Sequence, residues 1–214
     1  MPAPDSFQPL GSLRGVLAAF IPRIDGIDVA TDRETALQRL ASAHRDALSA
    51  AGFDPGSLAT AEQVHGGTAA VVAAPGKTAG VDALVTATKG LALGIYVADC
   101  AAVYIADRKG RAIALIHSGR AGTEADITGN TIRLMADEFG IDPADLVVHI
   151  SPCIRPPLYE TDFAATIARQ AREAGAGEVA DDGICTGRNV ARYYSYRVER
   201  GQTGRMLAVL ALAP

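Results

Sequence analysis

Three residues that can bind a metal ion each stand at the end of an apolar segment. His65 lies in the tetrapeptide Gln-Val-His-Gly, Cys100 in Ala-Asp-Cys, and His117 in His-Ser-Gly. The end of a strand holds a side chain firmly while its outward side stays open to a ligand. Two imidazoles and one thiolate suit zinc, and three protein ligands leave a fourth position for water or substrate. The pattern therefore indicates a catalytic zinc site.

The spacing of these ligands leaves plainer interpretations open. They are 35 and 17 residues apart and form no compact motif such as Cys-x-x-Cys or His-Glu-x-x-His. From the residues alone, each histidine could be an ordinary core or surface residue, and Cys100 a small buried apolar one. Asp99, beside the cysteine, could orient a ligand, act as a general base or cap the strand, and Asp82 has the same alternatives.

The other histidines and cysteines are given no part in the chemistry. His44 falls on a polar face of a predicted helix and is expected to be exposed, whereas His149 lies in an apolar strand and is expected to be structural. Cys153 and Cys185 have no histidine near them in the sequence and are expected to be inert thiols. Three widely separated cysteines make a poor disulfide framework and are typical of a reducing compartment. Four histidines are too few for a multinuclear copper oxidase, because such centres need many imidazole ligands.

The elements that would position these groups are mainly strands. Apolar and alternating patterns predict strands at residues 15–20, 58–64, 68–73, 83–86, 91–98, 102–106, 112–117, 146–150 and 205–211. Helical periodicity predicts helices at residues 32–51, 124–139, 162–174 and 189–197. Strands and helices do not alternate regularly, which favours an α+β fold over a doubly wound parallel sheet. Several strands are almost entirely apolar, so we expect sheets packed on each other with helices outside.

Composition limits the class of protein. The chain has 214 residues, of which 49% are hydrophobic and 21% charged, so we expect a single soluble domain over residues 1–214. No apolar run approaches the ~20 residues that cross a bilayer, and the first residues show no secretory signal, so we expect a cytoplasmic protein without membrane contact. The net charge of −4 argues against nucleic acid as a partner, whereas 17 arginines against 3 lysines suit an anionic small ligand. Nothing in the sequence indicates an oligomeric state.

Eight short motifs occur in the order found in a known family. From the N-terminus they are Gln63-Val-His-Gly66, Asp82-Ala-Leu-Val-Thr86, Ala98-Asp-Cys100, His117-Ser-Gly119, Ser151-Pro-Cys-Ile154, Tyr159-Glu160, Ser195-Tyr-Arg197 and Thr203-Gly-Arg-Met206. This ordered set resembles the laccase-domain family, whose members are also described as multicopper polyphenol oxidases, purine nucleoside phosphorylases and peptidoglycan editing factors. The resemblance implies a four-layer α/β/β/α sandwich with mixed sheets. It also implies a zinc site formed by His65, Cys100 and His117, with copper the less favoured metal.

The resemblance further implies a function. It points to a zinc-dependent enzyme that acts on purine nucleosides, by phosphorolysis, adenosine deamination or both, with a nucleoside and phosphate as small-molecule partners. Cys100, His117 and Asp99 are the expected catalytic residues, and Arg23 and Arg197, which match two family arginines, are expected to bind substrate. Two alternatives stay open. One is a metal-independent Cys/His hydrolase that acts on a peptidoglycan precursor with Cys100 as nucleophile; the other is a non-catalytic member that keeps the zinc site.

Two features depart from the family pattern. The usual run His-Ala-Gly-Trp-Arg-Gly-Thr is His117-Ser-Gly-Arg-Ala-Gly-Thr123 here, without the tryptophan. The loop that usually follows the first arginine has no counterpart after Arg23. The sequence therefore predicts an intact metal site beside a substrate pocket that is more open and less aromatic than is usual in the family.

Overall fold

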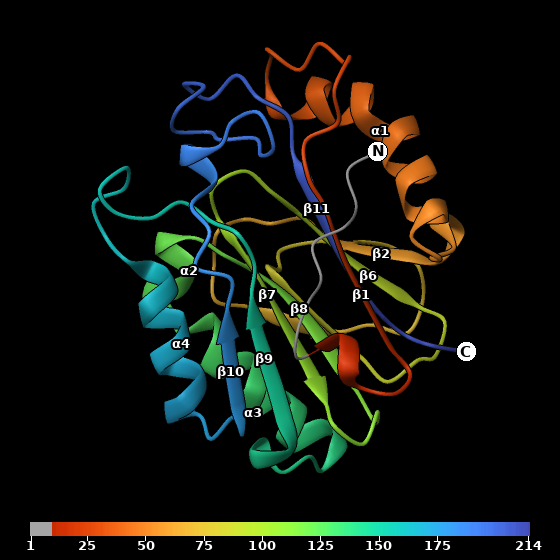
Figure 1. The fold of residues 1–214 in the computed structure, drawn as a ribbon. Helices are drawn as coiled ribbons and strands as arrows, with labels where there is room; N and C mark the ends of the chain where they lie inside the picture. The colour runs from red at the N-terminus through yellow and green to blue at the C-terminus, as the bar shows by residue number, and fades with distance from the viewer. Residues whose placement is uncertain (1–9) are drawn as a thin grey trace.

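Two β-sheets form the centre of the molecule in a computed structural model that describes residues 10–214 (Figure 1). The first sheet has the strand order β1-β11-β6-β2-β4. In that order its strands are Val16–Ile21, Met206–Leu212, Ala92–Val97, Leu58–Ala61 and Gly76–Thr78. β11 is antiparallel to β1 and β6, whereas β2 is parallel to β6 and β4, so the sheet is mixed.

The second sheet is also mixed and has the order β10-β9-β7-β8-β5-β3. In that order its strands are Glu178–Asp181, Leu146–Ile150, Ala101–Asp107, Ile113–Ser118, Ala83–Thr86 and Ala69–Val71. The central pairs are antiparallel, and the two outermost pairs are parallel. Every residue of β7, β8 and β9 is buried, as expected for strands covered on both faces.

Helices cover the outer face of each sheet (Figure 1). The α-helices are α1 Arg33–Ala50, α2 Arg120–Glu124, α3 Ile127–Phe139 and α4 Phe163–Glu173. Short 3₁₀ helices occur at Leu10–Ser12, Pro55–Ser57, Pro143–Asp145 and Thr186–Arg188. In the described part of the chain, no helix is long and apolar enough to cross a membrane.

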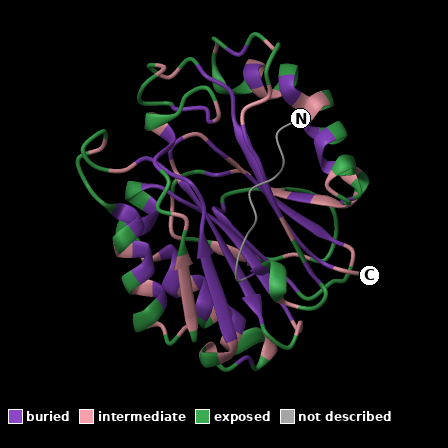
Figure 2. Cartoon of the chain, viewed as in Figure 1, coloured by how far each residue is buried: buried purple, intermediate pink, exposed green. Residues whose placement is uncertain are grey.

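Apolar contacts hold these four layers together. Leu48 of α1 packs on the first sheet, and Ile132 of α3 packs on the second. Between the sheets, Leu93 of β6 and Tyr104 of β7 belong to one buried cluster. Figure 2 shows central strands that are buried throughout, such as β7, β8 and β11, beneath helices that are buried only on their inner side. The predicted α+β fold with a four-layer α/β/β/α arrangement is confirmed.

The predicted strands are all present, but two helix predictions need correction. The helix expected over residues 124–139 is two helices, α2 and α3. Asp126 interrupts it with a left-handed φ of 52°, and its side chain then caps α3 by accepting the N–H of Gly129. The edge strands β4 and β10 were not predicted, because both are short and neither contains a fully buried residue.

The helix predicted over residues 189–197 is wrong, because this segment is a series of turns. Side chains from elsewhere take the backbone N–H groups that a helix would need. The N–H of Ser195 donates to Glu199 at 2.9 Å, and the N–H of Arg197 donates to Asp99 at 2.7 Å. Local periodicity could not reveal these acceptors, since one of them lies almost a hundred residues away.

His44 is buried rather than exposed, with 3% of its surface accessible. It follows Leu40 and precedes Leu48 on the face of α1 that packs against the first sheet. Its Nε2 lies 3.1 Å from the backbone oxygen of Arg205, which satisfies the buried ring. His149 is buried in β9, with its Nε2 3.0 Å from Oδ1 of Asp182.

Candidate metal centre and active site

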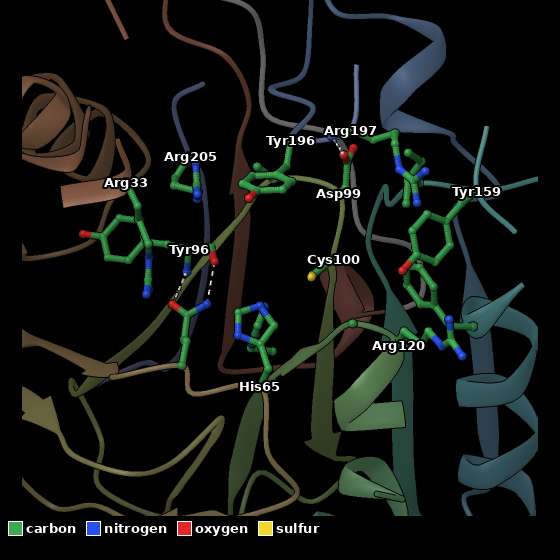
Figure 3. A pocket seen from close by; sticks show the side chains of 16 residues that line it. Arg33, His65, Tyr96, Asp99, Cys100, Arg120, Tyr159, Tyr196, Arg197 and Arg205 are labelled. Carbon is green, nitrogen blue, oxygen red and sulfur yellow. Dashed lines mark hydrogen bonds between the residues drawn. The ribbon is translucent and has the colours of Figure 1, made fainter. Parts of the chain in front are cut away.

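The folded chain brings His65, Cys100 and His117 together. Their ligand atoms all lie within 4.8 Å of one another, and the two imidazole rings meet edge to face with centroids 4.7 Å apart. His65 follows β2 of the first sheet, His117 belongs to β8 of the second, and Cys100 lies where the chain crosses from β6 to β7. All three line a cavity of 640 Å³, and Figure 3 shows His65 and Cys100 pointing into it.

The carboxylate of Asp82 holds two of these three residues in place. Its side chain is fully buried, and Oδ1 lies 2.8 Å from Nδ1 of His117. The same oxygen accepts the backbone N–H of His65 at 2.9 Å. Oδ2 accepts the N–H groups of Val64 at 3.1 Å and Gly66 at 2.8 Å. Because Nδ1 of His117 is engaged by Asp82, Nε2 is the atom left to bind a metal.

The same contacts set the charge of the thiol and the imidazole. Burial alone would raise the pKa of Cys100, but hydrogen bonds with His117 and His65 outweigh burial and lower the pKa to about 6. Burial alone would lower the pKa of His117, but its contacts with Asp82 and Cys100 raise the pKa to about 9. Without a metal, a thiolate therefore faces an imidazolium between about pH 6 and 9. The thiolate is the form that binds metals and attacks electrophiles.

The backbone around the three ligands adopts uncommon conformations and makes close contacts. Gln63 and His65 both have left-handed φ values, of 66° and 63°, which are uncommon outside glycine. The side-chain amide of Gln63 bonds both backbone groups of Tyr96, donating at 2.6 Å and accepting at 3.0 Å. A Cβ at Gly119 would lie only 2.6 Å from Sγ of Cys100, so glycine is required there. These features fix the ligand-bearing loops against one another.

The donor set fits a metal ion on its chemistry. Cys100 is already ionised near neutral pH, and His117 has a defined free nitrogen. Residues 10–214 contain no second group of three or more histidines, cysteines or acids that could hold an ion. The described chain thus offers one mononuclear site rather than a multinuclear one.

Asp99 is buried, and described residues occupy both of its carboxylate oxygens. Oδ1 accepts the hydroxyl of Thr186 at 2.7 Å. Oδ2 accepts the hydroxyl of Ser195 at 3.0 Å and the backbone N–H of Arg197 at 2.7 Å, as the dashed line in Figure 3 marks. These are the contacts of a positioning residue that ties two distant loops to Cys100. A role as general base stays a prediction.

The two arginines predicted to bind substrate lie in different surroundings. Arg197 lines the cavity and forms two 2.9 Å hydrogen bonds with Glu160. Arg23 is not among the described residues of the lining. Its Nη2 donates to Glu199 at 2.7 Å, and its guanidinium lies 4.3 Å from the ring centre of Tyr194. Arg23 therefore connects the end of β1 to the segment that carries Tyr194 and Glu199, and its substrate role stays a prediction.

The cavity also contains residues to which no sequence motif gave a role. Aromatic rings line it at Tyr96, Tyr159, Phe163 and Tyr196, and further arginines line it at Arg33, Arg120 and Arg205. These rings come from distant segments and give the cavity aromatic surface, and the expectation that it is more open and less aromatic than is usual in the family stays a prediction. Arg205 stands in the motif Thr-Gly-Arg-Met, and this was the one signal that could have drawn attention to it.

Cys153 and Cys185 are free and buried, and neither belongs to the group of residues that could hold a metal ion. They face each other across an isolated parallel bridge between two loops. Burial raises the pKa of Cys153 far above its ordinary value, so this thiol stays protonated and inert.

Comparison with known proteins decides the family. The profile of the family described as multi-copper polyphenol oxidoreductase laccase matches residues 22–162 and 159–213. The chain belongs to this family. The laccase-domain chain is 33% identical to a purine nucleoside phosphorylase of Streptomyces coelicolor, over 75% of this chain and 77% of the relative. It is 35% identical to the purine nucleoside phosphorylase of Deinococcus radiodurans, over 79% and 76% of the two chains.

Solved structures show the same laccase-domain fold. The crystal structure of YlmD from Geobacillus stearothermophilus superposes with a TM-score of 0.82 at 24% identity, covering 94% of this chain and 93% of that one. The hypothetical protein YfiH of Bacillus licheniformis superposes with a TM-score of 0.79 at 20% identity, covering 94% of each chain. The predicted family is confirmed, and so is its fold.

Replacing Asp82 by asparagine should weaken metal binding. The amide keeps the size of the carboxylate but loses the charge that orients His117, and loss of such a partner costs about 10–100-fold in affinity. Competition against a chromophoric chelator measures the affinity for a divalent metal. Asp137→Asn, at an exposed position of α3, is the matched control. Equal affinities in both variants and the wild type would contradict the role given to Asp82.

Cys100 of the metal-free protein should react with iodoacetamide along a shifted pH curve. Its rate should rise with a midpoint near pH 6, because the pKa is lowered from 9.0 to about 6 by the two histidines. Peptide mass spectrometry follows the modified residue, and buried Cys153 serves as an unreactive internal control. A midpoint at the ordinary thiol value would show that no thiolate–imidazolium pair forms.

Asp99→Ala should lower the free energy of unfolding by about 3 kcal/mol, since two buried hydroxyls and one part-buried N–H lose their acceptor. Chemical denaturation measures the change. Asp46→Ala, at an exposed position of α1, should stay within about 0.5 kcal/mol of the wild type. A stable Asp99→Ala protein would show that Asp99 does not anchor these loops.

Proposed function

We propose that this protein is a zinc-dependent enzyme that cleaves purine nucleosides by phosphorolysis. The observation that carries the proposal is the convergence of His65, Cys100 and His117 at a cavity walled by arginines and aromatic rings. Relatives that align with three quarters of the chain are named purine nucleoside phosphorylases, which supports the same reaction class.

Zinc is the metal favoured by the donors. A thiolate with two imidazoles matches its preference for sulfur and nitrogen, and a three-residue site leaves a position open for substrate. When bound there, zinc supplies a Lewis acid. The protein's own part is to hold Cys100 ionised through its contacts with His117 and His65, and to engage Nδ1 of His117 with Asp82 so that Nε2 is left for the metal.

The reaction also needs an anion and a purine to be held side by side. In phosphorolysis, a phosphate oxygen forms a bond to C1′ of the ribose while the bond from C1′ to the purine nitrogen breaks. The electron pair of the broken bond stays with the purine, which leaves after gaining a proton. Guanidinium groups of the cavity compensate the charge of the phosphate. The rings of Tyr159 and Tyr196 offer faces on which a purine can stack.

A second candidate is a metal-independent hydrolase. The observation that favours it is the pairing of the Cys100 thiolate with His117, which Asp82 orients in turn. This is the arrangement of a nucleophile, its base and a supporting carboxylate. Its substrate would carry an amide or similar bond, such as one in a peptidoglycan precursor.

Metal analysis combined with a nucleoside screen should separate these functions. We expect about one zinc per chain in the purified protein, and both the zinc and the turnover should be lost in Cys100→Ala. Inosine or adenosine should be consumed only when phosphate is present, giving the free base and a ribose phosphate, as followed by chromatography. Cys185→Ala, which removes a thiol outside the cavity, is the control and should keep both properties.

Three other results would each point elsewhere. Bound copper, or metal content unchanged in Cys100→Ala, would refute the assignment of the zinc site. Ammonia release from adenosine without phosphate would identify deamination as the reaction. Full hydrolytic activity after complete removal of metal would favour the Cys/His hydrolase.

A further inference from the structure

The arginines of the cavity differ in how their charge is compensated. Arg120 and Arg197 are each paired with a glutamate, at 2.8 and 2.9 Å. Arg33 and Arg205 form no ion pair with any residue in the described range 10–214. Figure 3 shows these two on the side of the cavity opposite Arg120 and Arg197, with Cys100 between the two sides. The positive charge that no ion pair compensates is therefore concentrated at one end of the cavity.

Arg205 is the more unusual of the two, because only 8% of its surface is accessible. Its Nη1 donates to the backbone oxygens of Thr203 and Gly204, both at 2.9 Å. No described residue accepts a hydrogen bond from its Nε or Nη2, although the side chain lines the cavity. Cys100 and Asp99 compensate its charge in part without an ion pair or hydrogen bond to it, and a buried cation with no directly bonded anion is costly. The Nε and Nη2 groups of Arg205 are therefore available to donate hydrogen bonds to an anion in the cavity.

Arg33 adds a second charge to the same place. Its one hydrogen bond to a described residue is a 3.4 Å contact from Nη2 to the backbone oxygen of Glu62. Burial, followed by the positive charge of Arg33, lowers the pKa of Arg205 from its ordinary value. The two guanidinium groups thus repel each other while staying charged at neutral pH. An anion between them would remove this repulsion.

Helix α1 positions both arginines. Arg33 is its first residue, and His44, on the buried face, donates from Nε2 to the backbone oxygen of Arg205 at 3.1 Å. Burial lowers the pKa of His44 to about 4, so the ring is neutral at physiological pH and adds no charge. The location of Arg205 therefore depends on a contact that sets its main chain, not on an acidic partner for its side chain.

We propose that Arg205 and Arg33 form a phosphate-binding subsite of the cavity. It lies across the metal centre from the wall formed by Tyr159 and Arg197. The assignment of the bound group as the phosphate that attacks C1′ rests on the proposed function. The two guanidinium groups recognise the doubly charged phosphoryl group itself, whether free or carried by a nucleotide. In this arrangement the nucleoside lies toward Tyr159, and phosphate approaches from the opposite side.

Calorimetric titration of the purified protein with inorganic phosphate tests the subsite. Arg33→Gln and Arg205→Lys should each weaken phosphate binding by about tenfold or more, since each removes charge-assisted hydrogen bonds. Arg169→Gln, on the exposed surface of α4, should bind as the wild type does. Thermal melting checks the fold of Arg205→Lys. Arg33 is exposed, so its variant stays informative even if Arg205→Lys unfolds.

Parallel titrations with adenosine 5′-monophosphate and with adenosine identify the source of the phosphate. If the nucleotide binds more tightly than free phosphate and the same two variants weaken it, the subsite holds a nucleotide phosphate. Phosphate binding that the two variants weaken, in a protein that turns over no nucleoside, would refute the proposed function and leave the subsite standing. Absence of phosphate binding by the wild type, or equal binding by Arg33→Gln and the wild type, would overturn the subsite.

Discussion

The buried carboxylate of Asp82 is the contact on which the site depends most. It precedes β5 in the second sheet, yet its oxygens reach both His117 on β8 and the turn that carries His65 out of the first sheet. One negative charge therefore sets the position of His117 in the second sheet relative to the loop that carries His65 from the first sheet to the second. The charge can be buried because the ring of His117 and three backbone N–H groups surround it.

The burial and pairing of the cavity arginines, more than their number, indicate where an anionic ligand would bind. The pairs of Arg197 with Glu160 and of Arg120 with Glu124 have side chains between 47% and 65% exposed, and exposed ion pairs contribute little free energy. They can open to admit a ligand at small cost. Arg205 is different because most of its side chain is shielded from water. The free-energy cost of its charge therefore depends mainly on the protein or ligand groups beside it.

Local signals explain which parts of this site could be predicted from the sequence. His65 and Cys100 each follow a strand and His117 lies at the end of one, and the order of the surrounding motifs indicated the family and hence the four-layer fold. The burial of His44 and the turns at residues 189–197 could not be predicted, because they depend on partners at Arg205, Glu199 and Asp99. Arg33 shows no signal at all, since a charged residue at the start of a helix is ordinary.

The position of Cys100 links the chemistry of the site to the integrity of the sandwich. The chain passes from the first sheet to the second at this residue. His65 lies in another such crossing, between β2 and β3, and His117 belongs to β8 of the second sheet. A metal ion bound by all three ligands would connect the two sheets at one end, and its binding free energy would add to the stability of the fold. Separation of the two sheets at that end would disrupt the metal site. Metal binding, and with it the chemistry of the site, is therefore coupled to the stability of the fold.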